Sequence, residues 1–185
     1  KNTLIFILFL GNLNFSIAQE SSPTKEVTVQ SINKYMNEAV GMEYYNLRED
    51  DNGNLTIIAI THIIEQNNFE LEEISCTTND TWIDGNYHNV VSEDSDIHWG
   101  NIVEIEIDST ETLWREQNLA AIFIFFSSKY RSHCYTFGGT FTIPRDDTDF
   151  RDRLCILIPK NRVTSCHKAL LHLKELMKEE DPFGN

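Results

Sequence analysis

One apolar segment, residues 119–126, constrains the fold of this chain most strongly. Its residues, Leu-Ala-Ala-Ile-Phe-Ile-Phe-Phe, are richer in aromatic and β-branched side chains than a surface helix would be. It is also much shorter than the ~20 residues that a membrane-spanning helix needs. We therefore interpret it as a buried strand. Two more strands are expected at 134–143 and 154–158, followed by a helix from about Thr164.

The N-terminal half contains one more helix and further strand patterns. Apolar residues at helical spacing predict a helix over 27–40, ended by Gly41. The segments 42–47 and 55–64 flank an Asp-Asn-Gly-Asn turn, which predicts a hairpin. Other strands are expected at 69–76 and 101–108. In the latter, Val103, Ile105 and Ile107 should share one face, opposite Glu104, Glu106 and Asp108.

Polar stretches between these elements are expected to be loops. They are the turn-rich residues 77–87, the acidic run 93–96 and the charged segment 145–153. Together these patterns predict a mainly β (α+β) domain of seven or eight antiparallel strands, with an N-terminal and a C-terminal helix. A barrel or a sandwich is favoured, because a long open sheet would leave unpaired edges.

The first residues are typical of a signal peptide. Lys1 supplies a positive charge, residues 4–10 an apolar segment, and Ser16, Ile17 and Ala18 the small residues of a cleavage site. We expect residues 1–18 to be removed. The remainder, 19–185, is expected to be a single secreted, extracellular domain without a membrane segment.

Export favours disulfides over reactive thiols or zinc sites. The four cysteines are Cys76, Cys134, Cys155 and Cys166, and their spacing matches neither a zinc knuckle nor a redox motif. Two structural disulfides are therefore expected, with three possible pairings. We favour Cys134 with Cys155, on strands that could be neighbours, which leaves Cys76 with Cys166.

Export also gives meaning to two sequons, at Asn54 and Asn79, which predict glycosylated surface positions. The formal net charge is −14, or −15 once Lys1 is removed. This charge would repel nucleic acids and anionic membranes, so neither is expected as a partner. It suits a basic partner, although solubility alone is an alternative reason for it.

No pattern points to an enzyme. The chain lacks a Gly-x-Ser-x-Gly elbow, and oxidised cysteines would not be nucleophiles. His167 and His172 are not spaced as the histidines of a helical zinc site, and the acidic run 146–149 lacks the glycine and glutamate of a calcium loop. We expect no catalytic residue, metal or cofactor. The alternative is a hydrolase that uses Glu104 and Glu106 as acid and base.

Aromatic residues near carboxylates point to binding instead. The expected ligand-binding residues are Tyr44, Trp82, Tyr87, Glu93, Asp94, Asp96, Trp99, Glu104 and Glu106. Such residues suit either a pocket for an amine or an anchor patch for a basic protein. Trp114 belongs to the same aromatic set, and the alternative is that the tryptophans belong to the core.

Several of these features resemble the secreted lipocalins of tick saliva, of the histamine-binding type. The similar features are Tyr44 and Tyr45 opening a strand, Lys129 and Tyr130 before Cys134, and Cys155 followed by Ile-Leu-Ile and then by Cys166 on a helix. The resemblance implies an eight-stranded barrel with a C-terminal helix packed on it, and the capture of host mediators. Another secreted parasite immunomodulator is the alternative.

The sequence therefore predicts a secreted, non-enzymatic binding protein. The first hypothesis is that it sequesters a basic extracellular mediator, such as a chemokine or cytokine, through an acidic surface with aromatic residues. The second is a lipocalin-like carrier of a small cationic or apolar ligand, such as a biogenic amine or a lipid.

Overall fold

The computed structural model describes residues 22–49, 55–82, 85–108, 118–140 and 146–180. The expected signal peptide (1–18), Asn54 and Trp114 lie outside these residues. The elements in chain order are α1 (Lys25–Asn37), β1 (Glu43–Glu49), β2 (Leu55–Phe69), β3 (Glu73–Trp82), β4 (Tyr87–Ser95), the 3-10 turn η1 (Trp99–Asn101), β5 (Ile102–Ile107), β6 (Leu119–Phe137), β7 (Asp146–Pro159) and α3 (Val163–Glu180).

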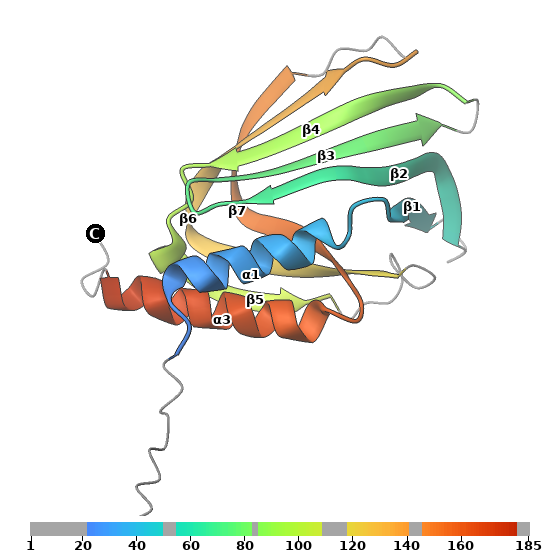
Figure 1. Ribbon diagram of the computed structural model, residues 1–185. Coiled ribbons are helices and arrows are strands. Elements are labelled where there is room, and N and C mark those ends of the chain that lie inside the picture. Colours follow the sequence, from blue (N-terminus) through green and yellow to red (C-terminus); the bar gives the residue numbers. More distant parts are fainter. Residues whose placement is uncertain (1–21, 50–54, 83–84, 109–117, 141–145, 181–185) are drawn as a thin grey trace, which may run out of the picture.

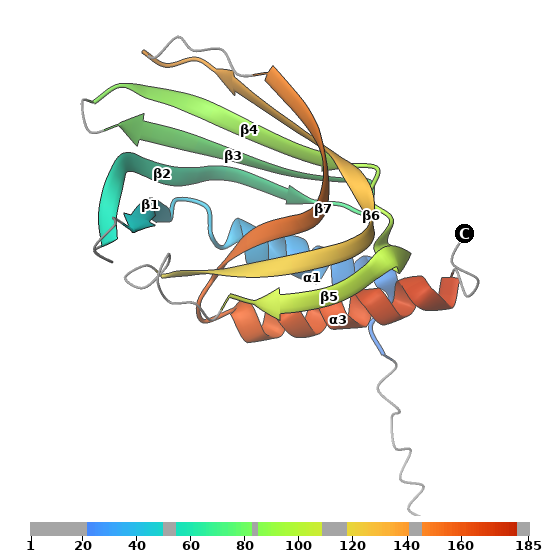
Figure 2. The ribbon, with the colours of Figure 1, turned by 180° about the vertical axis from the view of Figure 1, so that it is seen from behind.

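The strands of the described residues form one seven-stranded antiparallel sheet. Its order is β1-β2-β3-β4-β6-β5, and β7 also pairs with β6. The long strand β6 joins two parts of the sheet, because its C-terminal half pairs with β4 and its N-terminal half with β5. β7 follows both halves, with a register shift between Phe125 and Tyr130. At this irregularity the sheet bends, and Figures 1 and 2 show the resulting curl.

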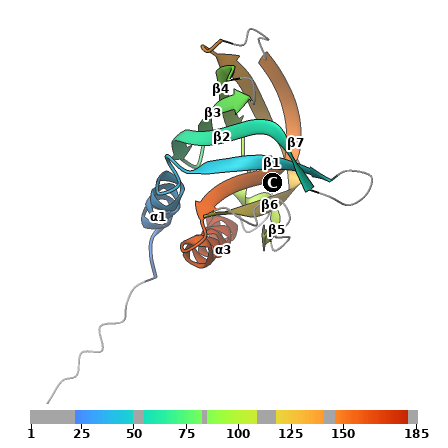
Figure 3. The same ribbon diagram turned by 90° about the vertical axis from the view of Figure 1, so that its right-hand side faces the viewer.

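The two helices lie side by side against the curled sheet (Figures 1 and 3). Ile32 and Met36 of α1, and Leu170 and Leu173 of α3, are buried in one core with side chains of β5, β6 and β7. The helix α1 begins as its sequence favours, because the Thr24 hydroxyl caps it by accepting from the Val27 amide at 3.4 Å. Neither helix in the described ranges has the length and apolar character needed to cross a bilayer.

The mainly β class and the two flanking helices are confirmed. The sheet is a half-barrel rather than a pair of stacked sheets, and within the described residues no ladder joins β1 to β7. The helix α3 lies along the free edge of β5, where Lys174 Nζ donates to the Val103 carbonyl at 2.7 Å. Covering an edge strand in this way limits pairing with other chains.

Several strands are longer than the sequence pattern indicates. The segments 77–87 and 93–96, expected as loops, lie largely in β3 and β4, and most of 145–153 lies in β7. The segments 119–126 and 134–137 are one continuous strand, β6. Polar residues are tolerated in these strands because their inward side chains find partners: the Thr78 hydroxyl donates to Asp80 Oδ1 at 2.8 Å.

The expected alternation of β5 is wrong. Ile102 and Ile105 are buried, whereas Val103 is 60% exposed and Ile107 is also exposed. The exposure of Val103 is caused by a register shift between Ile102 and Glu104 in the pairing with β6. Such a bulge inserts one residue and reverses the direction of the side chains that follow it.

The two expected disulfides are not formed, because all four cysteines are free thiols. Cys134 lies opposite Asp147 in the register of β6 and β7, eight residues along β7 from Cys155. This separates the two by about 27 Å along the strand, whereas a disulfide needs Cα atoms within about 7 Å. Cys166, a residue of α3, is fully buried in the main core, whereas Cys76 packs against a separate small cluster with Ala39 and Ile64.

Candidate functional site

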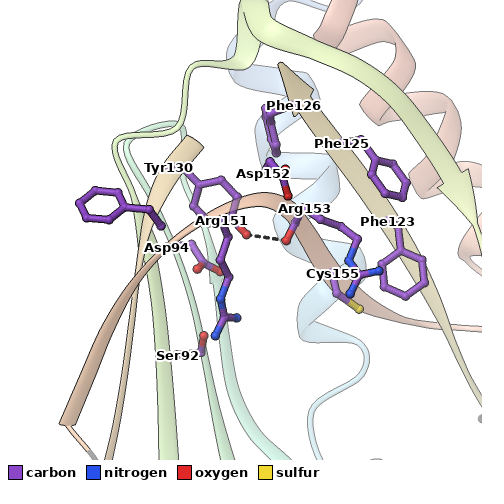
Figure 4. Close-up of a pocket in the computed structure, with 11 residues that line it drawn as sticks. Ser92, Asp94, Phe123, Phe125, Phe126, Tyr130, Arg151, Asp152, Arg153 and Cys155 are labelled. Atoms are coloured by element: carbon purple, nitrogen blue, oxygen red, sulfur yellow. Dashed lines mark hydrogen bonds between the residues drawn. The ribbon is translucent and has the colours of Figure 1, made fainter. Parts of the chain in front are cut away.

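A cavity of about 660 Å³ opens where β6 and β7 bend away from β4. Figure 4 shows its lining: an aromatic wall on one side and a group of charged side chains on the other. The lining residues are Ser92, Asp94, Phe123, Phe125, Phe126, Tyr130, Phe150, Arg151, Asp152, Arg153 and Cys155. They come from β4, β6 and β7, so the cavity exists only because the bend brings these strands to face one another.

The register of the β6–β7 hairpin builds the aromatic wall. Phe123 pairs with Cys155 and Phe125 with Arg153, and directly opposed residues share a face of the sheet. The Arg153 guanidinium lies 5.2 Å from the centre of the Phe123 ring. The Tyr130 hydroxyl donates to the Arg153 carbonyl at 2.7 Å, drawn as the dashed line in Figure 4. These contacts hold Arg153 in place at the cavity wall.

A second cavity, of about 340 Å³, continues along the concave face of the sheet. Ser92, Asp94 and Cys155 line both cavities, so the two share a wall. The surface that lines the second cavity is mostly apolar. It is formed by Met36, Ile74, Val90, Leu154, Ile156 and Leu157, together with Tyr44, His62, Cys76, Thr78 and Asp80. Five strands of the sheet, β1, β2, β3, β4 and β7, and the helix α1 contribute to it.

The second cavity is elongated, as the strand register shows. Asp94 lies opposite Ile74, and six residues further along β3, Asp80 lies opposite His62 of β2. Six residues of strand span about 20 Å. The cavity therefore has the shape of a trough, with Asp94 at the end that meets the larger cavity and His62 at the far end.

Asp94 is the most unusual ionisable residue of the site. Its side chain is largely buried, and its Oδ1 atom has no hydrogen-bond partner among the described residues. Burial raises the pKa of Asp94, and the nearby Ser132 hydroxyl and Arg151 guanidinium offset part of that rise. An unpaired buried carboxylate oxygen is costly, so this position favours a ligand that brings a donor.

Replacing Asp94 with asparagine is expected to make the unliganded protein more stable at neutral pH. Because burial raises the folded-state pKa, ionising Asp94 costs stability as the pH rises from its unfolded pKa, about 3.9, through the folded value. Below this range Asp94 is protonated in both states, so the difference in Tm should disappear. Thermal unfolding across this pH range measures it.

Asp96→Asn is a matched control for this variant. Asp96 is exposed and has a φ of 59°, a conformation that asparagine adopts readily. It should show no comparable gain in Tm at neutral pH. A lower Tm for Asp94→Asn than for the native chain at neutral pH would contradict the proposed cost of the buried charge.

At the far end of the trough, His62 is held in one orientation. Its Nδ1 lies 2.7 Å from Asp80 Oδ1, and its ring stacks on Tyr44 with centroids 4.6 Å apart. Because a carboxylate only accepts hydrogen bonds, Nδ1 carries the proton. Burial is also the main cause of the raised pKa of Tyr44. This end of the trough is thus closed by a compact, hydrogen-bonded group.

The cysteines of the trough are poor nucleophiles. Burial raises the pKa of Cys76 to about 11. Cys155 is exposed at the cavities, and desolvation by the neighbouring protein raises its pKa to about 12. Both thiols are therefore protonated at neutral pH. In the described ranges, no three His, Cys, Asp or Glu side chains gather in a way that could hold a metal ion.

The structure separates the residues that the sequence suggests for binding. Of these, Tyr44 and Asp94 line the trough, whereas Trp99 is buried in the core. Trp82, Tyr87 and Glu93 lie on β3 and β4 outside the cavity linings, and Asp96, Glu104 and Glu106 are exposed. The acidic and aromatic residues therefore do not form one surface patch.

The sequon at Asn79 lies within β3. Its side-chain amide donates to Asn89 Oδ1 on β4 at 2.9 Å, and it accepts from the Thr81 hydroxyl at 3.1 Å. A glycan is attached at the same amide nitrogen. Glycosylation of Asn79 would therefore require this cross-strand hydrogen bond to break.

Most of the residues that line the larger cavity were not expected from the sequence. Phe123 and Phe125 read as core residues, and Arg151 and Arg153 as part of a solvated loop. One signal was present in the sequence: the arginines alternate with Asp152 in a segment that ends in apolar residues 154–158, as a strand would.

Comparison with protein-family models, with curated proteins and with solved structures finds no match to this chain. The site must therefore be interpreted from its own geometry and chemistry.

Proposed function

We propose that this protein is a secreted, non-enzymatic carrier of a single-chain amphiphile, a small lipid-like ligand. The observation that supports this is the joining of an elongated, mostly apolar trough, about 20 Å long, to a larger cavity lined by charged and aromatic residues. An extended alkyl chain fits the first, and a polar head group fits the second. Ligand sites are commonly concave and mostly apolar, with a few polar groups that set orientation.

The energetic reason is the burial of the alkyl chain. Each methylene transferred from water into an apolar site contributes about 0.8 kcal/mol. Ile74, Val90, Ile156 and Leu157 supply such a site along the trough. Secretion remains a prediction from residues 1–18, and the carrier function is proposed for the domain that follows.

Affinity is expected to rise with chain length. For alkyl phosphocholines from octyl to dodecyl, each added methylene should tighten binding by up to about fourfold. Isothermal titration calorimetry below the concentration at which each compound forms micelles measures this. The heat-capacity change should become more negative with each methylene, because apolar surface is buried. An affinity that does not depend on chain length would rule out the trough as an alkyl site.

Capture of a basic secreted protein stays a prediction from the charge of the chain. The acidic and aromatic residues that suggest it lie on several parts of the fold, so the cavity argument favours the carrier.

A further inference from the structure

The larger cavity is electrically balanced. Its lining contains two cationic side chains, Arg151 and Arg153, and two carboxylates, Asp94 and Asp152. A purely anionic head group would face the two carboxylates, and a purely cationic one would face the two arginines, so each would meet two protein charges of its own sign. A head group with both signs can be placed so that each charge meets its opposite.

Asp94 is available to a cation. Arg151 lies near enough to lower the pKa of Asp94, but it forms a long ion pair with Asp149, with 3.9 Å between Nε and Oδ2. Asp94 is 91% buried, since its relative exposure is 9%, and Oδ1 has no partner in the part of the chain that the structure describes. A primary ammonium group would supply the missing donor.

The arginines are suited to an anion. The contact with Phe123 engages one face of the Arg153 guanidinium, and a guanidinium donates its hydrogen bonds from its edge rather than from its face. Figure 4 shows Arg151 beside Asp94 and directed toward Ser92, across the cavity from Arg153. A planar guanidinium binds phosphate through two parallel hydrogen bonds, which makes arginine the usual phosphate ligand of this kind.

We infer that the larger cavity binds a zwitterionic head group, with a primary ammonium at Asp94 and a phosphate between Arg151 and Arg153. This inference rests on the proposed carrier function and names the class of its ligand: a single-chain phosphoethanolamine amphiphile. The alkyl chain then enters the trough past Asp94, and the head group faces the open side near the exposed Phe150.

Three ligands with the same chain test the head group. They are dodecyl phosphoethanolamine, dodecyl phosphate and dodecylammonium, which are zwitterionic, anionic and cationic. The zwitterion should bind about tenfold more tightly than either of the others, because only it forms a charge-assisted hydrogen bond with each side of the cavity. Equal affinities of the zwitterion and the phosphate would overturn the inference.

Two variants test which residue binds each charge of the head group. Asp94→Asn should remove the preference for phosphoethanolamine over phosphate without weakening phosphate binding. Arg151→Gln should weaken both phosphate compounds and leave dodecylammonium unaffected or tighter. Asp96→Asn and Arg131→Gln, at exposed positions outside the cavities, are the matched controls and should leave the order of affinities unchanged.

Different results would contradict the head-group inference and the carrier function. If Asp94→Asn leaves the ratio of phosphoethanolamine to phosphate affinity as it is in the native chain, the head-group inference is wrong even when affinity still rises with chain length. If none of the three dodecyl compounds binds and the chain-length series is flat, the carrier function itself fails. Circular dichroism of each variant shows whether the sheet is retained.

Discussion

Trp99→Ala is expected to lower the free energy of unfolding by about 3–5 kcal/mol, the range for large aromatic residues removed from a core. Trp99 is only 2% exposed, and it packs against Phe69 and Phe126 with ring centroids 5.3 and 6.0 Å away. Its indole nitrogen donates to the Leu71 carbonyl at 2.8 Å. The variant therefore leaves both a large void and a carbonyl without its donor.

Denaturant unfolding followed by far-ultraviolet circular dichroism measures this loss. The control is Trp82→Ala, at the end of β3, where the side chain is only half-buried and belongs to neither hydrophobic cluster. Its cost should be clearly smaller. Equal losses for the two tryptophans would mean that η1 does not anchor the β4–β5 connection to the core.

Val90→Trp is expected to weaken ligand binding about a hundredfold with little effect on stability. Val90 lies in the middle of the trough, in the same cross-strand row as Thr78 and Thr136. An indole at this position would occupy the space of several methylenes of the alkyl chain. Losing the burial of about four methylenes costs about 3 kcal/mol, which weakens Kd on the order of a hundredfold.

Val103→Trp is the matched control, because it makes the same change at an exposed position of β5. Titration of dodecyl phosphoethanolamine into both variants measures the difference. The Tm of Val90→Trp should stay close to that of the native chain, since the new side chain fills an existing cavity rather than a packed core. Unchanged ligand affinity in Val90→Trp would show that the alkyl chain does not occupy the trough.

Helical elements were the easiest to predict from the sequence. The apolar stripe of α3 includes Cys166, Leu170 and Leu173, and all three are buried in the core. The predicted helix at 27–40 corresponds to α1, with a shift of two to three residues at its ends. An amphipathic pattern over several turns is a long, redundant signal, so small local errors do not change it.

Strand boundaries were harder to predict, for a physical reason that β4 illustrates. Val90, Ser92 and Asp94 face the cavities, while Val91 and Glu93 occupy the alternate positions. Both sets mix apolar and polar residues, so alternation gives no indication of which face points inward. The sequence therefore places Asp94 in a solvated loop, although it is a buried residue of the candidate site.

The sequence by itself determined the class of the fold: antiparallel strands, a helix at each end of the described domain, and an apolar segment at 119–126 in the centre. These features depend on local periodicity, which neighbouring residues fully specify. Only the tertiary structure decided that the cysteines stay apart and that the arginines of β7 face Asp94 of β4. Both outcomes depend on the bend of β6 and on strand register, which arise from contacts between segments distant in the chain.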